Sequence, residues 1–492
     1  MNYFETTLPV GWARTTLSQI CWKITDGSHN PPPKAQVGLP MLSAVNVSGN
    51  RIVFGQHRLI SDEDFEREDL RTSVSPGDVL LTIVGTIGRS AVVPVKTPRL
   101  TLQRSVAVLK PIEVDPTFIM YQLESAKTNR YLNDNAKGTA QKGIYLRNLG
   151  FTPFLLPPLN EQRRIVEKIE TLFAQLDKGE EAVRQVQKLL NRYRQSVLKS
   201  AVTGELTADW RSERADQLKP SQNLLVQILQ TRREKWAARR KYEEPKAVAL
   251  TDLPMLPEIW LWTNMDALIV HGPQNGLYLP QNKYGDGTPI IRIDDFQTGW
   301  VRPIKNLRRV RATPEEIILH SLKNGDFVIN RVNSVSHLGK TMLVDAEHEG
   351  ALFESNMMRL SVSDRVDRSF LELYLSSSIG RKRLIANCKH AVNQASINQG
   401  DVAATAVPLP PLEEQQEIVV LAKERLARAE VLVEWCDAEL KRSASLRQSI
   451  LKDAFAGKLV PQDPADEPAS ALLARIATAQ PIARKARRKT SA

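Results

Sequence analysis

Two stretches of this chain repeat apolar residues at alternating spacings of three and four, the pattern of a long helix packed against another helix. In the first stretch, from Asn160 to Lys199, these positions are Ile165, Ile169, Leu172, Leu176, Gly179, Val183, Val186, Leu190, Tyr193 and Val197. In the second they are Val419, Ala422, Leu426, Ala429, Val433, Cys436, Leu440 and Ser443, which are mostly small, so this seam is the poorer of the two. At a rise of about 1.5 Å per residue, each helix should be about 60 Å long. We interpret both as coiled-coil helices, and the alternative is two amphipathic helices that each pack only on their own domain.

The two helical stretches belong to one segment that the chain contains twice. LPPLNEQRRIV, starting at Leu156, returns as LPPLEEQQEIV at Leu409, and SVLKSAVTGEL at Ser196 returns as SILKDAFAGKL at Ser449, each with an offset of 253 residues. The Pro-Pro pair should end the element before it, because proline lacks a donor and restricts its neighbour. Asn160 or Glu413 then lies at the helix cap, with a glutamate in the first turn. The repeat therefore predicts two spacer helices of equal length.

Each spacer helix follows a region of about 150 residues whose sequence is not shared, apart from short echoes such as LPVGW with LPEIW and GDVLLTIVG with GDFVINRVN. Short β-branched runs bounded by Gly, Pro or Asn predict strands there. The runs are Asp78 to Val84, Ala91 to Val95, Arg104 to Leu109, Pro289 to Ile293 and Phe327 to Ile329, and helices are expected at Pro116 to Glu124 and Ser369 to Ser376. Both regions are therefore expected to be α+β.

These observations divide the chain into six parts. We expect a first variable region at 1–155, a first spacer helix at 156–207, a linker with a basic helix at 208–255, a second variable region at 256–408, a second spacer helix at 409–460 and a basic, disordered tail at 461–492. The linker helix, Gln222 to Glu244, carries cations that suit phosphate or form a solvated face, namely Arg232, Arg233, Lys235, Arg239, Arg240 and Lys241. The tail holds Arg484, Lys485, Arg487, Arg488 and Lys489, which add nonspecific attraction to nucleic acid.

Composition adds a partner class and a compartment. The chain has 67 Lys plus Arg against 55 Asp plus Glu, a formal charge of +12 that favours a polyanionic partner, although a basic soluble enzyme has the same balance. Its cysteines, Cys21, Cys388 and Cys436, are too few and too far apart for a disulfide framework or a paired metal site. No window of the sequence approaches the roughly 20 apolar residues that span a membrane. We therefore expect a cytoplasmic protein with no membrane partner.

Catalytic signatures are missing from the sequence. SHNPPPKA, Ser28 to Ala35, approaches the Asn-Pro-Pro-aromatic loop of adenine methyltransferases, but Pro33 stands where the aromatic should be. No Walker-type loop, HExxH or paired CxxC occurs, and GTIG from Gly85 is too short for a dinucleotide fingerprint. We therefore expect no catalytic residue, no metal and no cofactor.

The tandem LPPLNEQ and LPPLEEQ motifs, their helices and the endings SVLKSAVTGEL and SILKDAFAGKL resemble the specificity (S) subunit of type I restriction-modification enzymes. The resemblance covers essentially the whole chain. It implies that the variable regions are target recognition domains, held apart by two antiparallel helices with an internal pseudo-two-fold repeat. It also implies that the partners are double-stranded DNA with a bipartite target, two modification (M) subunits that carry the methylation site, and restriction (R) subunits that translocate and cleave.

The resemblance also suggests site residues. The partner-binding surface would include Glu161, Gln162, Ile165 and Leu172 in the first helix, and Glu414, Gln415, Ile418 and Leu426 in the second. For DNA we choose polar side chains expected on loops. These are His29, Asn30, Arg89, Arg104, Gln141 and Lys142 in the first region, and Gln274, Asn275, Arg331, Asn333, His337, Lys340, Asn393 and Gln394 in the second.

Two other functions stay open at the level of sequence. A single-chain DNA methyltransferase or nuclease conflicts with the missing donor-binding and catalytic motifs. A coiled-coil scaffold without a role in DNA recognition explains the helices but leaves the paired variable regions unexplained.

Overall fold

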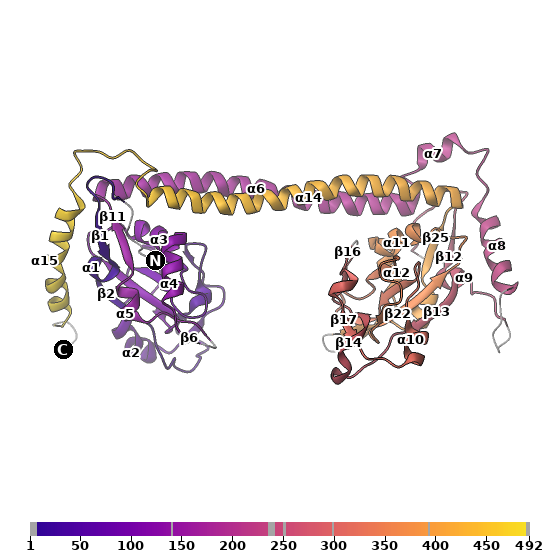
Figure 1. Cartoon of the computed structure of the whole chain (residues 1–492), viewed down its shortest axis with the longest axis horizontal. Helices are drawn as coiled ribbons and strands as arrows, with labels where there is room; N and C mark the ends of the chain where they lie inside the picture. The colour runs from indigo at the N-terminus through magenta and orange to yellow at the C-terminus, as the bar shows by residue number, and fades with distance from the viewer. Residues whose placement is uncertain are drawn as a thin grey trace. The chain divides into compact units, whose positions relative to one another are not determined.

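The computed structural model describes residues 7–138, 141–234, 242–248, 252–297, 300–391 and 394–488 of the chain. The chain divides into two compact units (Figure 1). Unit 1 is Met1–Val183 with Asp437–Ala492, and unit 2 is Arg184–Cys436. Both long helices, α6 (Leu159–Thr203) and α14 (Leu412–Ala454), contribute one part to each unit. Among the described residues, no helix has the length and apolar content that crossing a membrane requires.

The first variable region is built on a four-stranded antiparallel sheet in the order β2-β10-β7-β8. Its strands are β2 (Cys21–Asp26), β7 (Val79–Thr82), β8 (Ser90–Val92) and β10 (Val106–Pro111). In the described part of the chain, three smaller sheets accompany it. The sheet β6-β3-β9 consists of β3 (Leu39–Leu42), β6 (Arg58–Ile60) and β9 (Thr101–Leu102). The sheet β4-β5 consists of β4 (Val47–Ser48) and β5 (Arg51–Ile52), and the sheet β1-β11 of β1 (Ala13–Thr16) and β11 (Pro153–Leu156). The helices are α1 (Leu17–Ile20), α2 (Asp62–Thr72), α3 (Pro116–Glu124), α4 (Ala126–Asp134) and α5 (Leu146–Gly150).

The second variable region repeats this plan. Its four-stranded sheet has the order β13-β22-β18-β20, from β13 (Ile269–Asn275), β18 (Phe327–Asn330), β20 (Thr341–Leu343) and β22 (Met357–Val362). Three smaller sheets of the described residues match those of the first region. The sheet β17-β14-β21 consists of β14 (Tyr284–Ile291), β17 (Arg308–Val310) and β21 (Leu352–Phe353). The sheet β15-β16 consists of β15 (Phe296–Gln297) and β16 (Trp300–Val301), and the sheet β12-β25 of β12 (Leu261–Asn264) and β25 (Ala406–Leu409). The helices are α9 (Met265–Leu268), α10 (Pro314–His320), α11 (Arg368–Ser376), α12 (Ser378–Leu384) and α13 (Gln399–Ala403). A sheet with no counterpart among the described strands of the first region, β19-β24-β23, adds β19 (Val332–Asn333), β23 (Lys389–Ala391) and β24 (Gln394–Ser396). The α+β class and the internal repeat predicted from the sequence are confirmed.

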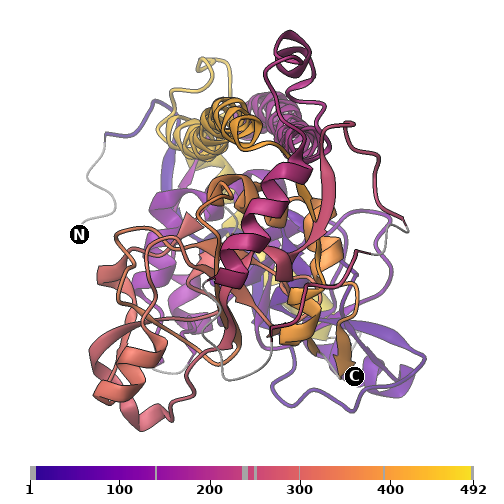
Figure 2. The same ribbon diagram turned by 90° about the vertical axis from the view of Figure 1, so that its right-hand side faces the viewer.

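The large hydrophobic core of each unit joins a variable region to parts of both long helices. In unit 1, Ile165 and Ile169 of α6 and Leu451 and Ala454 of α14 lie in the same buried cluster as the strands of the main sheet. In unit 2, Val197 and Ala201 of α6 cluster in the same way with Ile418 and Ala422 of α14. In both units the paired segments run antiparallel, since rising numbers in α6 meet falling numbers in α14. Figures 1 and 2 both draw the two helices side by side.

The two helical seams differ in how evenly they are buried. In α14, the small seam residues Ala422, Ala429, Cys436 and Ser443 are buried, with at most 8% of each residue exposed. In α6, the larger seam residues Val186 and Tyr193 are 40% and 44% exposed. The second seam has the smaller apolar residues and is also the more evenly buried of the two. Small side chains let the neighbouring backbone come close and cover them, whereas bulkier side chains are left at the edge of the contact.

Two predictions need correction. The tail expected to be disordered from 461 forms helix α15 (Ala469–Arg488), whose residues Ala469, Leu472 and Ile476 are buried in the core of unit 1. Its i, i+3, i+7 apolar spacing gives it a face that the core covers. The linker helix expected from Gln222 to Glu244 is α8 (Ser221–Glu234), preceded by α7 (Ala208–Glu213), and residues 242–244 are not helical. Arg232 of α8 forms an ion pair with Asp266, and Arg233 with Glu244. Lys235, Arg239, Arg240 and Lys241 lie outside the described residues.

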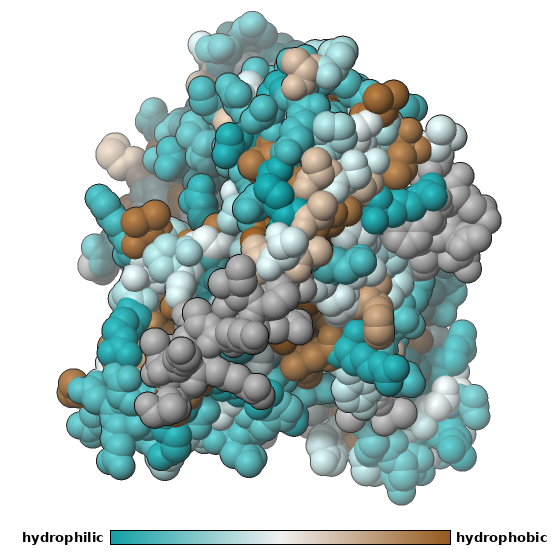
Figure 3. Space-filling view, turned by 90° about the vertical axis from the view of Figure 1, so that its left-hand side faces the viewer, coloured by the Kyte–Doolittle hydropathy of each residue, from teal (hydrophilic) through white to brown (hydrophobic). Residues whose placement is uncertain are grey.

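The face of the molecule that Figure 3 presents is mainly hydrophilic, with apolar side chains in small separate groups. Small apolar groups are normal on the surface of a soluble domain.

Candidate nucleic-acid interface

The repeated Pro-Pro-x-x-Glu-Gln motif forms the joint between each variable region and its helix. The side chain of Gln162 donates from Nε2 to the carbonyl of Pro157 over 2.9 Å, and its Oε1 accepts from the backbone nitrogen of Asp115 over 3.0 Å. Asp115 caps α3 by accepting from Thr117 and Phe118. The buried amide of Gln162 thus fixes the last turn of the variable region and the start of α3 to the same helix end.

The second copy of the motif repeats these bonds. Gln415 donates to the carbonyl of Pro410 over 2.8 Å and accepts from the backbone nitrogen of Asp367 over 2.9 Å. Asp367 caps α11, the counterpart of α3. A glutamine is suited to this place because one amide group both donates and accepts.

The loops at one end of the main sheet lie together in the first variable region. They are residues 27–30 after β2, 83–89 between β7 and β8, 103–105 before β10 and 141–144 before α5, and we call them the first loop surface. Backbone hydrogen bonds connect them in a chain: Arg104 N to Ser28 O at 2.9 Å, Ile83 N to Ser105 O at 2.9 Å, and Gly85 N to Lys142 O at 2.9 Å. A Cβ on Gly27 would lie 1.9 Å from the carbonyl oxygen of Leu102, so only glycine allows this close approach.

All six DNA-binding candidates of the first variable region lie on the first loop surface. They are exposed and come from four separate parts of the sequence: His29, Asn30, Arg89, Arg104, Gln141 and Lys142. His29 also pairs with Asp26 over 2.8 Å, while its side chain stays 56% exposed. The four loop segments contain no aspartate or glutamate. This combination of exposed cations and amides without carboxylates suits contact with phosphates and base edges.

The equivalent loops of the second variable region also lie together. They are residues 275–278, 331–340, 354–356, 389–391 and 394–397, and we call them the second loop surface. Arg331 N donates to Asn356 O over 2.8 Å, Ile397 N to Arg331 O over 2.9 Å and Ser355 N to Leu277 O over 3.0 Å. The DNA-binding candidates Asn275, His337 and Gln394 are exposed there, and Asn333 and Lys340 are half-buried. Asn393 lies outside the described residues.

Charge distinguishes the two ends of the main sheet in the second variable region. The second loop surface carries Arg331, His337, Lys340, Lys389 and His390, and its carboxylate Glu354 is paired with Arg292 at 3.5 Å. The segments at the opposite end, 321–326, 344–350 and 362–367, carry six carboxylates against the two cations Lys323 and Arg365, and the carboxylates are Asp326, Asp345, Glu347, Glu349, Asp364 and Asp367. The balance of charge therefore favours the second loop surface over the opposite end of the sheet for contact with a polyanion.

Two candidates in the second variable region are held by the chain itself. Gln274 donates to the carbonyl of Leu319 over 3.0 Å and accepts from Arg359. Arg331 is half-buried and donates from Nη1 to the carbonyl of Ser355 over 3.0 Å. Both side chains therefore help to hold the loops in place. If either side chain turned toward DNA, these hydrogen bonds would break. Their contact with DNA stays a prediction.

The structure adds residues that the sequence alone did not single out. Lys389 and His390 are exposed on β23, next to Gln394 on β24. Arg381 of α12 donates to the carbonyls of Leu338 and Ser336 and so holds the 331–340 loop in place. Burial, followed by the neighbouring charge of Arg381, lowers the pKa of Lys340. No local motif marks these residues, because the contacts join segments about 45 positions apart.

One cluster has the residue types of a metal site, within the part of the chain that the structure describes: Asp345, Glu347 and His348. His348 is buried, and both of its ring nitrogens are engaged, Nδ1 with Asp345 at 2.6 Å and Nε2 with the carbonyl of Arg302 at 2.9 Å. Burial alone would lower the pKa of His348, but these two oxygen partners outweigh it and raise the pKa. In this geometry each ring nitrogen of His348 already faces an oxygen of the chain.

The partner-binding candidates are mostly inside the protein. Glu161, Gln162, Ile165, Glu414, Gln415 and Ile418 are at most 1% exposed. They belong to the joints and cores described above, so the structure gives them a role within the chain. Leu172 and Leu426 are half-buried on the helices, and for these two a partner contact stays a prediction.

In a comparison with known proteins, one family model matches two segments of the chain, in agreement with the internal repeat. The model of the family described as Type I restriction modification DNA specificity domain matches residues 9–184 and 273–421. The chain is 26% identical over 511 residues to the type I restriction enzyme EcoKI specificity subunit of Escherichia coli (strain K12), covering 98% of this chain and 99% of that relative. It is 27% identical over 494 residues to the StySPI specificity subunit of Salmonella potsdam, covering 95% of each. A solved chain from work on complex assembly and conformational transition of the type I R-M system aligns at a TM-score of 0.60 and 20% identity, covering 92% of this chain and 100% of that chain, which shows a shared fold.

Proposed function

Because this chain belongs to the family of type I restriction modification DNA specificity domain proteins, we propose that it gives a type I restriction-modification complex its choice of DNA sequence. The first and second loop surfaces each read one part of a bipartite duplex target. The chain performs no chemistry itself. Partner M subunits methylate adenine, and partner R subunits translocate and cleave the DNA.

The observation that carries this proposal is the repetition of the loop surface on two regions whose loop sequences differ. The same sheet order supports both surfaces, and each gathers exposed cations and amides from loops far apart in the chain. Phosphate contacts by such cations would give affinity and register, and the amide and basic side chains that differ between the surfaces would select bases. Two different surfaces on one scaffold suit a target with two different parts.

The spacer helices supply the fixed separation that a bipartite target needs. Half-sites on B-DNA must recur at a fixed phase of the roughly 34–36 Å helical repeat, so a stiff element of constant length selects the number of bases between them. Removing one heptad from both α6 and α14 should shorten the preferred spacer and leave both half-sites unchanged. An unaltered spacer would contradict the role of the helices as a ruler.

Exposed apolar side chains on the helical part of unit 2 support the docking of a protein partner. Val186, Leu189 and Tyr193 of α6 are between 40% and 59% exposed, and Val431, Leu432 and Trp435 of α14 between 50% and 65%. Val186, Leu189 and Tyr193 follow an i, i+3, i+7 spacing, which places them on one face of α6, where they could contact another protein. We assign the partner as an M subunit, in two copies per chain, one for each variable region.

The proposal is tested by mapping methylated adenines in the genome of the source cell, with and without this chain. We expect a two-part motif to lose methylation when the chain is removed and to regain it when the chain is restored. Persistence of the same methylated motif without the chain would contradict the proposal. Methylation by the purified chain alone would favour a single-chain methyltransferase.

A further inference from the structure

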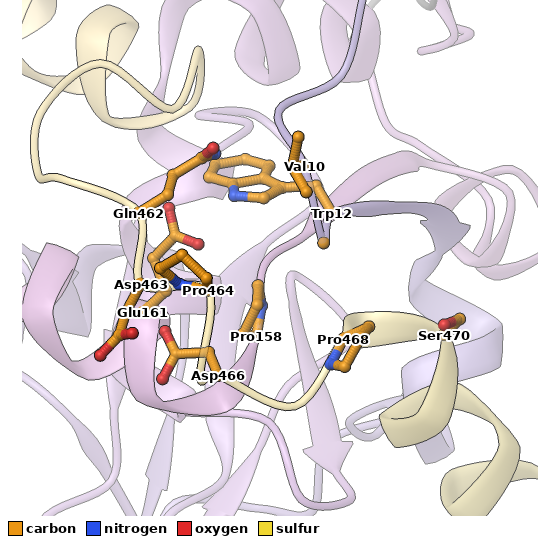
Figure 4. A pocket seen from close by; sticks show the side chains of 11 residues that line it. Val10, Trp12, Pro158, Glu161, Gln462, Asp463, Pro464, Asp466, Pro468 and Ser470 are labelled. Carbon is orange, nitrogen blue, oxygen red and sulfur yellow. The ribbon is translucent and has the colours of Figure 1, made fainter.

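A hollow of about 610 Å³ lies in unit 1 where the chain enters the first variable region and leaves α14. Its wall comes from Val10 to Trp12, from Pro158 and Glu161 at the start of α6, and from residues 462–470 (Figure 4). The volume falls in the range of roughly 300–1,000 Å³ that is common for sites that bind small groups.

Glu161 is the buried polar group of this hollow. The residue is 1% exposed, and its Oε1 has no hydrogen-bond partner among the described residues. The indole nitrogen of Trp12, which also lines the hollow, is buried and interacts with the Glu161 carboxylate without completing a hydrogen bond. Leaving a buried polar atom unsatisfied costs about 1–3 kcal/mol, and more for a charged one. Burial raises the pKa of Glu161, although nearby Trp12 and Arg164 lower it.

At the matching place in unit 2, the buried glutamate has hydrogen-bond donors. Glu414, which is completely buried, accepts from Thr207 Oγ1 over 2.7 Å, from Arg211 Nη1 over 2.6 Å and from Trp260 Nε1 over 2.7 Å. The guanidinium of Arg211 also lies over the Trp260 ring, 5.9 Å from its centroid. Glutamate, arginine and tryptophan thus form one closed group in unit 2.

Unit 1 keeps two members of this group and lacks the third. At the offset of 253 residues that relates the helices, Thr207 corresponds to Val460 and Arg211 to Pro464. Neither residue can donate a hydrogen bond from its side chain. The nearest cation, Arg164, is paired with Asp466 at 2.6 Å. Two further carboxylates, Asp463 and Asp466, line the hollow and add negative charge.

We propose that this hollow binds the guanidinium of an arginine that belongs to another protein chain, in the place that Arg211 fills in unit 2. The planar guanidinium donates to Glu161 and stacks on Trp12, which is the pairing that Arg211 makes with Glu414 and Trp260. A metal ion is a poorer occupant, because among the described carboxylates the liganding oxygens of Glu161, Asp463 and Asp466 do not come close enough together to share one ion.

The proposal is tested on the full chain labelled with 5-fluorotryptophan and observed by ¹⁹F NMR, with the Trp12 signal assigned from Trp12→Phe. N-acetyl-arginine amide should shift the Trp12 signal saturably, with a Kd on the order of 1 mM, the affinity of a single small group. N-acetyl-citrulline amide has the same shape without the charge and should leave the signal in place. The Trp260 signal is an internal control, since its site already contains Arg211.

Two variants separate specific binding from a change in fold. Glu161→Gln should weaken the binding of N-acetyl-arginine amide at least about tenfold, because it removes the charge that the guanidinium pairs with. Pro464→Arg should shift the Trp12 signal without any probe and abolish the titration, because the chain then supplies its own guanidinium. An equal response to the citrulline probe, an undiminished response in Glu161→Gln, or no saturable response at all would overturn the proposal.

The source of the arginine is tested in the same titration. Free arginine carries an α-carboxylate that Asp463 and Asp466 repel, so it should bind more weakly than N-acetyl-arginine amide. Tighter binding of free arginine would assign the hollow to a small metabolite and overturn the assignment to a protein chain.

Discussion

The indole nitrogen of Trp260 donates a hydrogen bond to Oε2 of Glu414 over 2.7 Å. The two residues lie 154 positions apart, one in the LPEIW entry of the second variable region and the other in the first turn of α14. This bond closes the second variable region at the point where the chain enters it and leaves it. A tryptophan and a glutamate, Trp12 and Glu161, stand at the matching places of the first copy.

Removal of Arg211 should destabilise unit 2 strongly. The side chain of Glu414 is completely buried and that of Arg211 is 19% exposed, so Arg211→Ala leaves a buried carboxylate without its cation. We expect a loss of about 3 kcal/mol or more in the free energy of unfolding, measured by native-state hydrogen exchange of unit 2. Arg214→Ala, which removes a more exposed arginine three residues away, is the matched control and should change stability by less than about 0.5 kcal/mol. Equal effects of the two variants would contradict this assignment.

The glutamine of the repeated motif should also stabilise its unit. Gln415→Ala leaves the carbonyl of Pro410 and the backbone nitrogen of Asp367 without their partner. The expected loss is about 1–3 kcal/mol in the free energy of unfolding, measured by urea denaturation. The neighbouring Gln416 is exposed, and Gln416→Ala should be nearly neutral. If both alanine variants left stability unchanged, the claim that Gln415 stabilises the joint between the variable region and α14 would be contradicted.

The stability of unit 1 should fall as pH rises through the range in which Glu124 ionises. Burial raises the pKa of Glu124 from 4.5 to about 7, so between these values the folded state binds more protons than the unfolded state. Stability is then lost from about pH 4.5 up to about pH 7, by at most about 3 kcal/mol. Glu124→Gln should remove most of this slope when unfolding is followed between pH 4.5 and 8. An unchanged slope in the variant would mean that another group is responsible.

Cations of the first loop surface should contribute to DNA affinity through phosphate. Arg104→Ala and Lys142→Ala should each weaken binding and lower the slope of log K against log salt by about 0.9, if each contacts one phosphate. Lys96, an exposed lysine near the other end of the same sheet, gives the control Lys96→Ala, which should leave the slope unchanged. The measurement is fluorescence anisotropy of a labelled duplex over a salt series. A slope change in the control of the same size would place the contact surface elsewhere.

Much of the fold follows from local pattern. The helix expected at Pro116 to Glu124 is α3 with the same bounds, because Asp115 and Pro116 are strong signals for a helix start. The first spacer helix expected from Asn160 to Lys199 runs from Leu159 to Thr203. The strand expected at Phe327 to Ile329 is β18. In these segments the periodicity and the flanking residues act together, and tertiary contacts do not override them.

Other features depend on contacts that no local pattern contains. Burial of the small seam of α14 depends on how closely α6 approaches, and the order of α15 depends on a core built mostly from residues about 300 or more positions earlier. The candidate site was predicted from the sequence only in part. The choice of polar residues on expected loops correctly predicted that side chains such as Arg104 and Lys142 are exposed. The hydrogen bonds of Gln274 and Arg331 within the chain could not be predicted, because they arise from the packing of distant segments.

The central claim, that the chain reads a two-part DNA target through two separate loop surfaces, is tested most directly by selection from a random duplex library with the chain and its M partner. We predict an enriched motif of two specific parts separated by a spacer of constant length. Lys142→Ala combined with Gln141→Ala should relax one part only, and His337→Ala combined with Gln394→Ala the other. Enrichment of a single continuous motif, or of no motif, would contradict the claim.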